Sequence, residues 1–113
     1  MSTELENKVK STFPEFEITE EMEGIPVVIF SFLSVWLREC IKNEDQLLIG
    51  RFVNFVNLLA NEKDSLTVSC LSEIFLGLYC STEIDYKIFK NQLSEKANQK
   101  FQETIYAWDS QYR

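Results

Sequence analysis

Residues that interrupt helices are scarce in this sequence, and this scarcity limits the possible fold classes. Its 113 residues include only three glycines and two prolines. A sandwich or barrel with many tight turns needs more of these residues, whereas long segments without them favour helices. With 45% hydrophobic residues there is enough apolar material for one core. We therefore predict a single all-α domain, residues 1–113, with five or six helices paired as antiparallel helical hairpins stacked around one core.

We divide this domain into an acidic N-terminal part, residues 1–25, and a helical core, residues 26–110. In the N-terminal part, Ser2 or Thr3 can cap a first helix that Pro14 stops. A connector follows, in which acidic and apolar residues alternate at first. In the core, we expect the first helix to run from Pro26 to Lys42, with proline at its first position.

Capping residues predict where the later helices begin. Asp45 marks the start of one helix, Asp64 or Ser65 that of the next, and the latter ends near Cys80. The two remaining starts, one of them for a short helix, are predicted at Asp85 and Ser94.

Helical spacing also predicts which residues are buried. In the helix after Asp64 the expected core row is Val68, Leu71, Phe75 and Leu78, and in the last helix it is Ala97, Phe101, Ile105, Trp108 and Tyr112. A polar stripe on the first core helix contains Ser31, Ser34, Arg38 and Lys42. We expect this stripe to face water.

The three cysteines, Cys40, Cys70 and Cys80, each lie in an apolar stretch and form no Cys-x-x-Cys pair. We interpret them as reduced core thiols. The polar start of the chain lacks the pattern of a signal peptide, and the most apolar run, residues 25–37, is too short to cross a membrane. These features predict a cytoplasmic protein with no membrane partner.

An acidic run is the most unusual local feature: five glutamates fall in nine residues, with no basic residue among them. Of the net charge of -7, residues 1–45 carry -6. The run is either a solvated connector or a surface for a basic partner, with the interleaved Phe16, Ile18 and Met22 as apolar anchors. Two acidic pairs at the expected hairpin tips can be helix caps or rim contacts. The candidate partner-binding residues are Glu15, Glu17, Glu20, Glu21, Glu23, Glu44, Asp45, Glu62 and Asp64.

The absence of histidine argues against most familiar catalytic sites, because it removes the commonest general base and the pairs in which histidine activates serine or cysteine. The acidic run is a poor catalytic centre, since its crowded carboxylates should stay solvated. We expect no enzyme, no catalytic residues, no metal site, no cofactor and no small-molecule substrate. The excess of acid also argues against a nucleic-acid partner.

Three apolar patterns carry a resemblance to known proteins: GIPVVIFSFL at 24–33, LIGRFVNFVNLL at 48–59 and LSEIFL at 71–76. Over residues 14–108 the chain resembles small acidic helical bacterial proteins of the kind found as immunity proteins in contact-dependent inhibition and other polymorphic toxin systems. The resemblance implies a protein that binds a secreted toxin domain, often a nuclease, and blocks its active site. It rests on apolar spacing and transfers no functional residue.

We therefore consider two alternative functions. The first is an immunity protein that neutralises a cognate basic toxin, with a nuclease as the expected kind, by occlusion. The alternative is a general protein-interaction or adaptor module. An enzyme is a third hypothesis, which a deep polar pocket holding a carboxylate of shifted pKa would favour.

Overall fold

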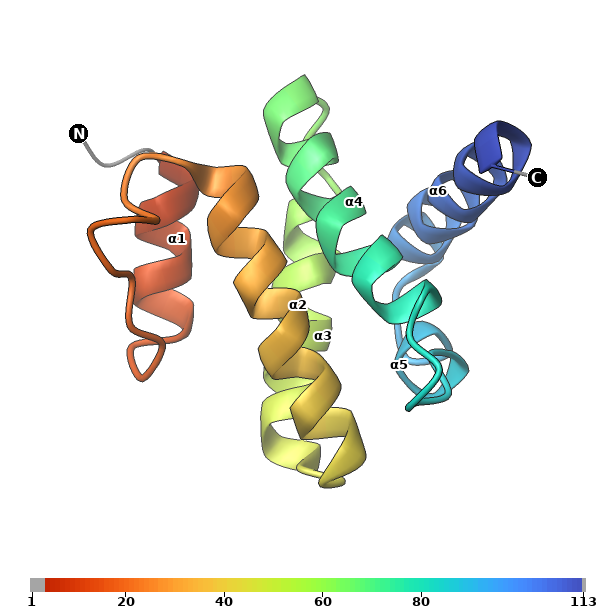
Figure 1. Cartoon of the computed structure of the whole chain (residues 1–113), viewed down its shortest axis with the longest axis horizontal. Helices are drawn as coiled ribbons and strands as arrows, with labels where there is room; N and C mark the ends of the chain where they lie inside the picture. Colours follow the sequence, from red (N-terminus) through yellow and green to blue (C-terminus); the bar gives the residue numbers. More distant parts are fainter. Residues whose placement is uncertain (1–3, 113) are drawn as a thin grey trace.

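The structure, a computed structural model, describes residues 4–112. These residues form six α-helices and no strand, which confirms the predicted all-α class (Figure 1). The predicted cap at Ser2 or Thr3 lies outside the described residues. The helices are α1 (Glu4–Thr12), α2 (Pro26–Lys42), α3 (Gln46–Leu59), α4 (Ser65–Tyr79), α5 (Lys87–Lys90) and α6 (Glu95–Tyr112).

The predicted caps set the starts of the long helices. The Asp45 carboxylate accepts a hydrogen bond from the Leu48 backbone N–H at 3.2 Å and so caps α3. Asp64 caps α4 by accepting from the Thr67 N–H at 3.0 Å. The Ser94 hydroxyl accepts from the Ala97 N–H at 3.2 Å at the start of α6. Each bond satisfies a backbone donor that the helix itself leaves without a partner.

The most extensive contact between helices joins α2 and α4, which are not consecutive in the chain (Figure 1). Gly77 makes this contact possible, because a Cβ atom there would lie 1.8 Å from the Ser34 Oγ. Ser34 is only 2% exposed, so its predicted place on a solvent-facing stripe is wrong. A small residue is needed at the point where two helix backbones approach closely, and serine meets that need.

One apolar cluster joins all six helices. Its largest fully buried side chains are aromatic: Phe13, Phe30, Phe52, Phe75, Phe89 and Phe101. Leu5 and Val9 of α1 belong to the same cluster. The N-terminal helix therefore packs on the core that the later helices share.

Some predicted core positions lie at the edge of this cluster instead. Val68 and Tyr112 are exposed, and Trp108 is only half-buried. In Figure 1 the start of α4 and the end of α6 diverge from each other, which agrees with the exposure of Val68 and Tyr112. The apolar row of α6 is therefore buried only as far as Ile105.

Candidate functional site

The acidic connector, residues 13–25, is attached to the core at its start by aromatic packing. Phe13 is fully buried, and its ring centroid lies 4.4 Å from that of Phe52 on α3. Phe16 stacks on Trp36 of α2, with ring centroids 5.8 Å apart. The connector therefore begins on the seam between α2 and α3.

A buried carboxylate holds the other end of the connector. Glu6 of α1 is fully buried, and its Oε1 accepts a hydrogen bond of 2.7 Å from the Gly24 backbone N–H. Gly24 has a φ of 79°, a left-handed conformation that glycine adopts without strain. We did not predict this role for Glu6, although the sequence contains a signal for it. Glu6 precedes Val9 by three residues and Phe13 by seven, which places it on the apolar face of α1.

Glu15 differs from the other four glutamates of the connector. Its Oε1 lies 2.6 Å from the Arg51 Nη1 of α3, and this hydrogen bond lowers the pKa of the Glu15 carboxyl. The Arg51 guanidinium also lies over the Phe13 ring, 5.9 Å from its centroid. Arg51 is therefore a counter-charge for Glu15 that the neighbouring sequence does not reveal, and this ion pair links the connector to α3.

The other four glutamates project into solvent and define what we call the acidic surface. Glu17, Glu20, Glu21 and Glu23 are exposed, and none forms a salt bridge with any residue in the described part of the chain. The interleaved apolar residues have a structural role within the protein, and their role as anchors for a partner stays a prediction. Phe16, Ile18 and Met22 are half-buried and pack against the core, so they anchor the connector to its own protein.

The remaining candidates lie at the two ends of α3. Glu44, with a φ of 54°, is exposed beside the cap residue Asp45 at the α2–α3 tip. At the α3–α4 tip, Glu62 lies 3.9 Å from the Lys8 Nζ, and hydrogen bonds from the Thr67 backbone and hydroxyl lower the pKa of Asp64. The 14 residues of α3 separate the tips by about 21 Å. The nine candidates therefore do not form one continuous surface.

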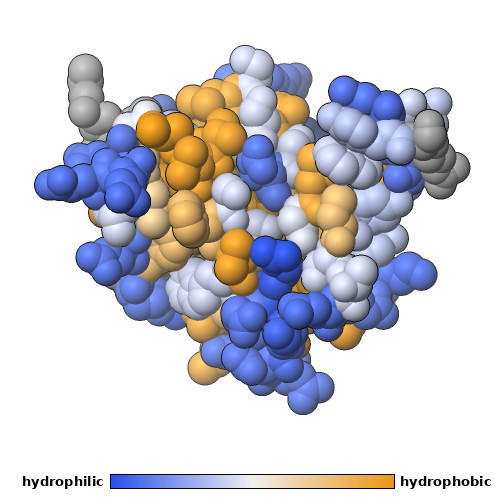
Figure 2. Space-filling view, in the orientation of Figure 1, coloured by the Kyte–Doolittle hydropathy of each residue, from blue (hydrophilic) through white to orange (hydrophobic). Residues whose placement is uncertain are grey.

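An exposed apolar surface lies next to the acidic surface. Val28, Phe32 and Val35 follow one another along α2, and Ile25 directly precedes its first residue; we call these four residues the α2 stripe. Ile25, Phe32 and Val35 are 48%, 49% and 46% exposed, and Val28 is half-buried. Figure 2 shows hydrophobic surface over the first half of α2 beside hydrophilic surface on the side of the connector. We did not predict this stripe from the sequence, because α2 is apolar almost all round and its spacing does not distinguish the exposed apolar side from the buried one.

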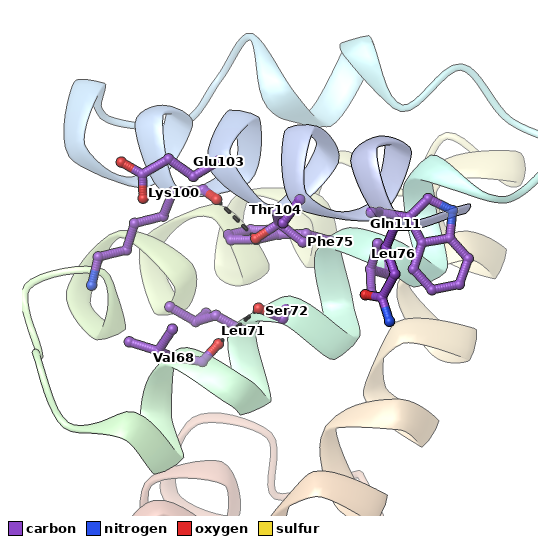
Figure 3. Close-up of a pocket in the computed structure, with 11 residues that line it drawn as sticks. Val68, Leu71, Ser72, Phe75, Leu76, Lys100, Glu103, Thr104 and Gln111 are labelled. Atoms are coloured by element: carbon purple, nitrogen blue, oxygen red, sulfur yellow. Dashed lines mark hydrogen bonds between the residues drawn. The ribbon is translucent and has the colours of Figure 1, made fainter. Parts of the chain in front are cut away.

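A groove of about 390 Å³ lies between α4 and α6 (Figure 3). Leu71, Phe75 and Leu76 line its α4 side. The Thr104 hydroxyl of α6 donates to the Lys100 carbonyl at 2.9 Å. The Ser72 hydroxyl makes the equivalent bond within α4, at 3.0 Å to the Val68 carbonyl. The groove therefore offers mostly apolar contacts, with these two hydroxyls bonded within their own helices.

The cysteines divide into two buried thiols and one exposed thiol. Burial raises the pKa of Cys40 and of Cys70 to about 11, so both stay protonated at neutral pH. This agrees with the predicted core thiols. Cys80 is exposed, and its predicted core position is wrong because it lies past the end of α4.

Within residues 4–112, no three side chains of the metal-binding types are grouped as a metal site would require. Among the helices in that range, none combines the length and the apolar character needed to span a membrane.

Comparison with protein-family models gave no match to this chain. Comparison with curated proteins and with solved structures gave no match either. Function is therefore inferred from the surface of the molecule.

Proposed function

We propose that this protein is an immunity protein that binds a basic toxin domain, with a nuclease as the expected kind, and neutralises it by occlusion. The acidic surface carries the proposal. It presents four exposed glutamates without salt bridges in the described structure, on a connector held at both ends.

Electrostatic attraction affects both the rate and the place of binding. Carboxylates without counter-charges attract a basic partner over distances of about a Debye length, and this attraction raises the association rate. A nuclease needs a basic surface to hold the phosphates of its substrate, and a row of carboxylates can occupy that surface in their place. Because the connector is attached to α1, α2 and α3, binding costs little ordering of the acidic segment.

The first test is direct neutralisation. The protein is co-expressed with the product of the adjacent gene, and both growth protection and co-purification are measured. Protection together with a stable complex supports the proposal. A stable complex without any effect on a toxic activity would favour the adaptor function instead, and failure of the two proteins to associate would refute the immunity function for that pair.

The second test asks whether the acidic surface contributes to binding. We compare Glu20→Gln/Glu21→Gln with Glu95→Gln/Glu103→Gln, since both variants remove two exposed negative charges but at different places. We expect the first variant to associate several-fold more slowly at low salt and to show a flatter salt dependence. Equal association rates for the two variants would mean that only the net charge matters.

A further inference from the structure

We propose that the α2 stripe is the docking seam for a basic amphipathic helix of the partner protein. This inference rests on the proposed function in so far as it assumes a basic protein partner, and it adds where that partner binds and in what form.

The spacing of the stripe is that of a helix-packing seam. From Ile25 through Val28 and Phe32 to Val35, the steps are three, four and three residues. Alternating steps of three and four place side chains where a second helix can pack along the first. The ten helical residues from Pro26 to Val35 extend about 15 Å, enough for about three turns of a partner helix.

The opposite side of α2 is already occupied. Ile29, Leu33 and Leu37 are buried in the core, and Ser34 faces Gly77 of α4. The α2 stripe is therefore the apolar side of α2 that the fold leaves uncovered. Individual exposed apolar residues are normal on a protein surface, but a row at helix-packing spacing is typical of a docking site.

The charge at the connector end of the seam favours a basic occupant. Glu20, Glu21 and Glu23 precede Ile25 by only two to five residues. They are exposed and form no salt bridge within the described residues. Lysine or arginine residues flanking the apolar face of a partner helix would complement these charges.

The other end of the seam is acidic as well. Glu39 follows Val35 by one turn. The Lys42 Nζ forms salt bridges with the Glu39 Oε1 at 3.6 Å and with the Glu83 Oε2 at 3.3 Å. Beyond Val35, the charged residues around the end of α2 are Glu39, Glu44, Asp45 and Glu83 against Arg38 and Lys42, a net charge of -2.

Acidic charge at both ends argues against a second copy of this chain as the occupant. A parallel pair would place the two connector ends together, and an antiparallel pair would place each connector end against the acidic far end. Both arrangements oppose like charges, which is unfavourable across an interface. An anionic membrane surface is disfavoured for the same reason.

The test uses two synthetic peptides of identical composition. In the first peptide, leucines at heptad positions a and d form one apolar face and lysines occupy the other faces. In the second peptide the same residues are scrambled, so that no apolar face forms. Binding is followed by chemical-shift changes of the full-length protein in solution.

We expect the amphipathic peptide to shift the resonances of the α2 stripe and to bind at least tenfold more tightly than the scrambled peptide. Phe32→Ser and, independently, Val35→Ser should each weaken binding about tenfold. Leu47→Ser and Leu58→Ser are the matched controls, since these side chains are 87% and 70% exposed on α3. They should leave the affinity unchanged within twofold.

Three results would overturn the inference: no binding of the amphipathic peptide, equal binding of both peptides, or shifts that map to the α4/α6 groove. Dimerisation through the stripe, detected by sedimentation, or binding to anionic vesicles would replace the proposed occupant. Failure of the seam and failure of the immunity function give different results. Peptide binding at the α2 stripe without toxin neutralisation would support the docking seam and refute the immunity function. Full neutralisation of the toxin by the Phe32→Ser variant would support the immunity function and refute the docking seam.

Discussion

Replacing Gly77 with alanine is expected to destabilise the fold, although alanine is the better helix former. In the interior of a helix, alanine is favoured over glycine by about 0.5–1 kcal/mol. At Gly77 the added methyl group meets α2: its Cβ would lie 1.8 Å from the Ser34 Oγ and 2.9 Å from the Ser34 Cβ. The hydroxyl can rotate away, but the Cβ is fixed to the backbone. Relief therefore requires movement of a helix.

Gly50 on α3 provides a matched control, because an added Cβ there has no neighbour within 4 Å. The intrinsic preference for alanine is the same in both variants and cancels in the comparison. The difference between them then measures the clash. Carbon atoms pack best at about 3.5–4.0 Å, so α2 and α4 must separate by roughly 1 Å. Overpacking of this kind costs about 1–3 kcal/mol, and we expect the two variants to differ in stability by that amount.

The assay is urea unfolding followed by circular dichroism. Gly50→Ala should match or exceed the wild type, and Gly77→Ala should fall below Gly50→Ala. Adding Ser34→Gly to Gly77→Ala removes the opposing Cβ and should recover part of the loss, as a positive coupling in a double-mutant cycle. Equal stability of the two alanine variants, or simple additivity in the cycle, would refute the inferred close approach of α2 and α4.

Three further predictions concern the core, acid stability and thiol reactivity. Phe52→Ala should lower the free energy of unfolding by about 3–5 kcal/mol because the ring is fully buried. Trp108→Ala should lower it less, since this indole is half-buried. Equal losses of the two variants in urea unfolding would contradict this prediction. Hydrogen bonds from Thr67 lower the pKa of Asp64 in the folded state, so its stabilisation is present above the ordinary value of 3.8 and is lost as the pH falls through the lowered value. Asp64→Asn should therefore flatten the decline of stability in acid, and an unchanged slope would remove this group as a cause. A thiol reagent should modify Cys80 rapidly in the native protein and the two buried cysteines only after denaturation, and rapid modification of all three would show that the core opens readily.

Much of the helical organisation could be predicted because its causes are local. Pro26 begins α2, as its fixed φ and missing N–H favour. Asp45 and Asp64 begin the next two helices by accepting from N–H groups three residues later. Each of these interactions spans only a few residues, so the sequence alone determined where α2, α3 and α4 begin and that the fold is all-α.

The candidate site was only partly predictable, because its details depend on contacts between distant segments. The acidic run was visible in the sequence, but the pairing of Glu15 with Arg51 joins residues 36 positions apart. The hydrogen bond from Gly24 to Glu6 spans 18 positions. No local pattern specifies either partner, and only folding identifies which glutamates remain without one.

Tertiary structure also decided which side of each helix is buried. Helical spacing shows that Ile29, Phe32 and Val35 of α2 are apolar, but it does not show how many neighbouring helices the fold supplies to cover them. The crossing of α2 and α4 buries Ser34 against Gly77 and leaves Phe32 49% exposed. Hydrophobicity determines that a residue favours burial, whereas the direction in which the next helix packs determines whether that residue is buried.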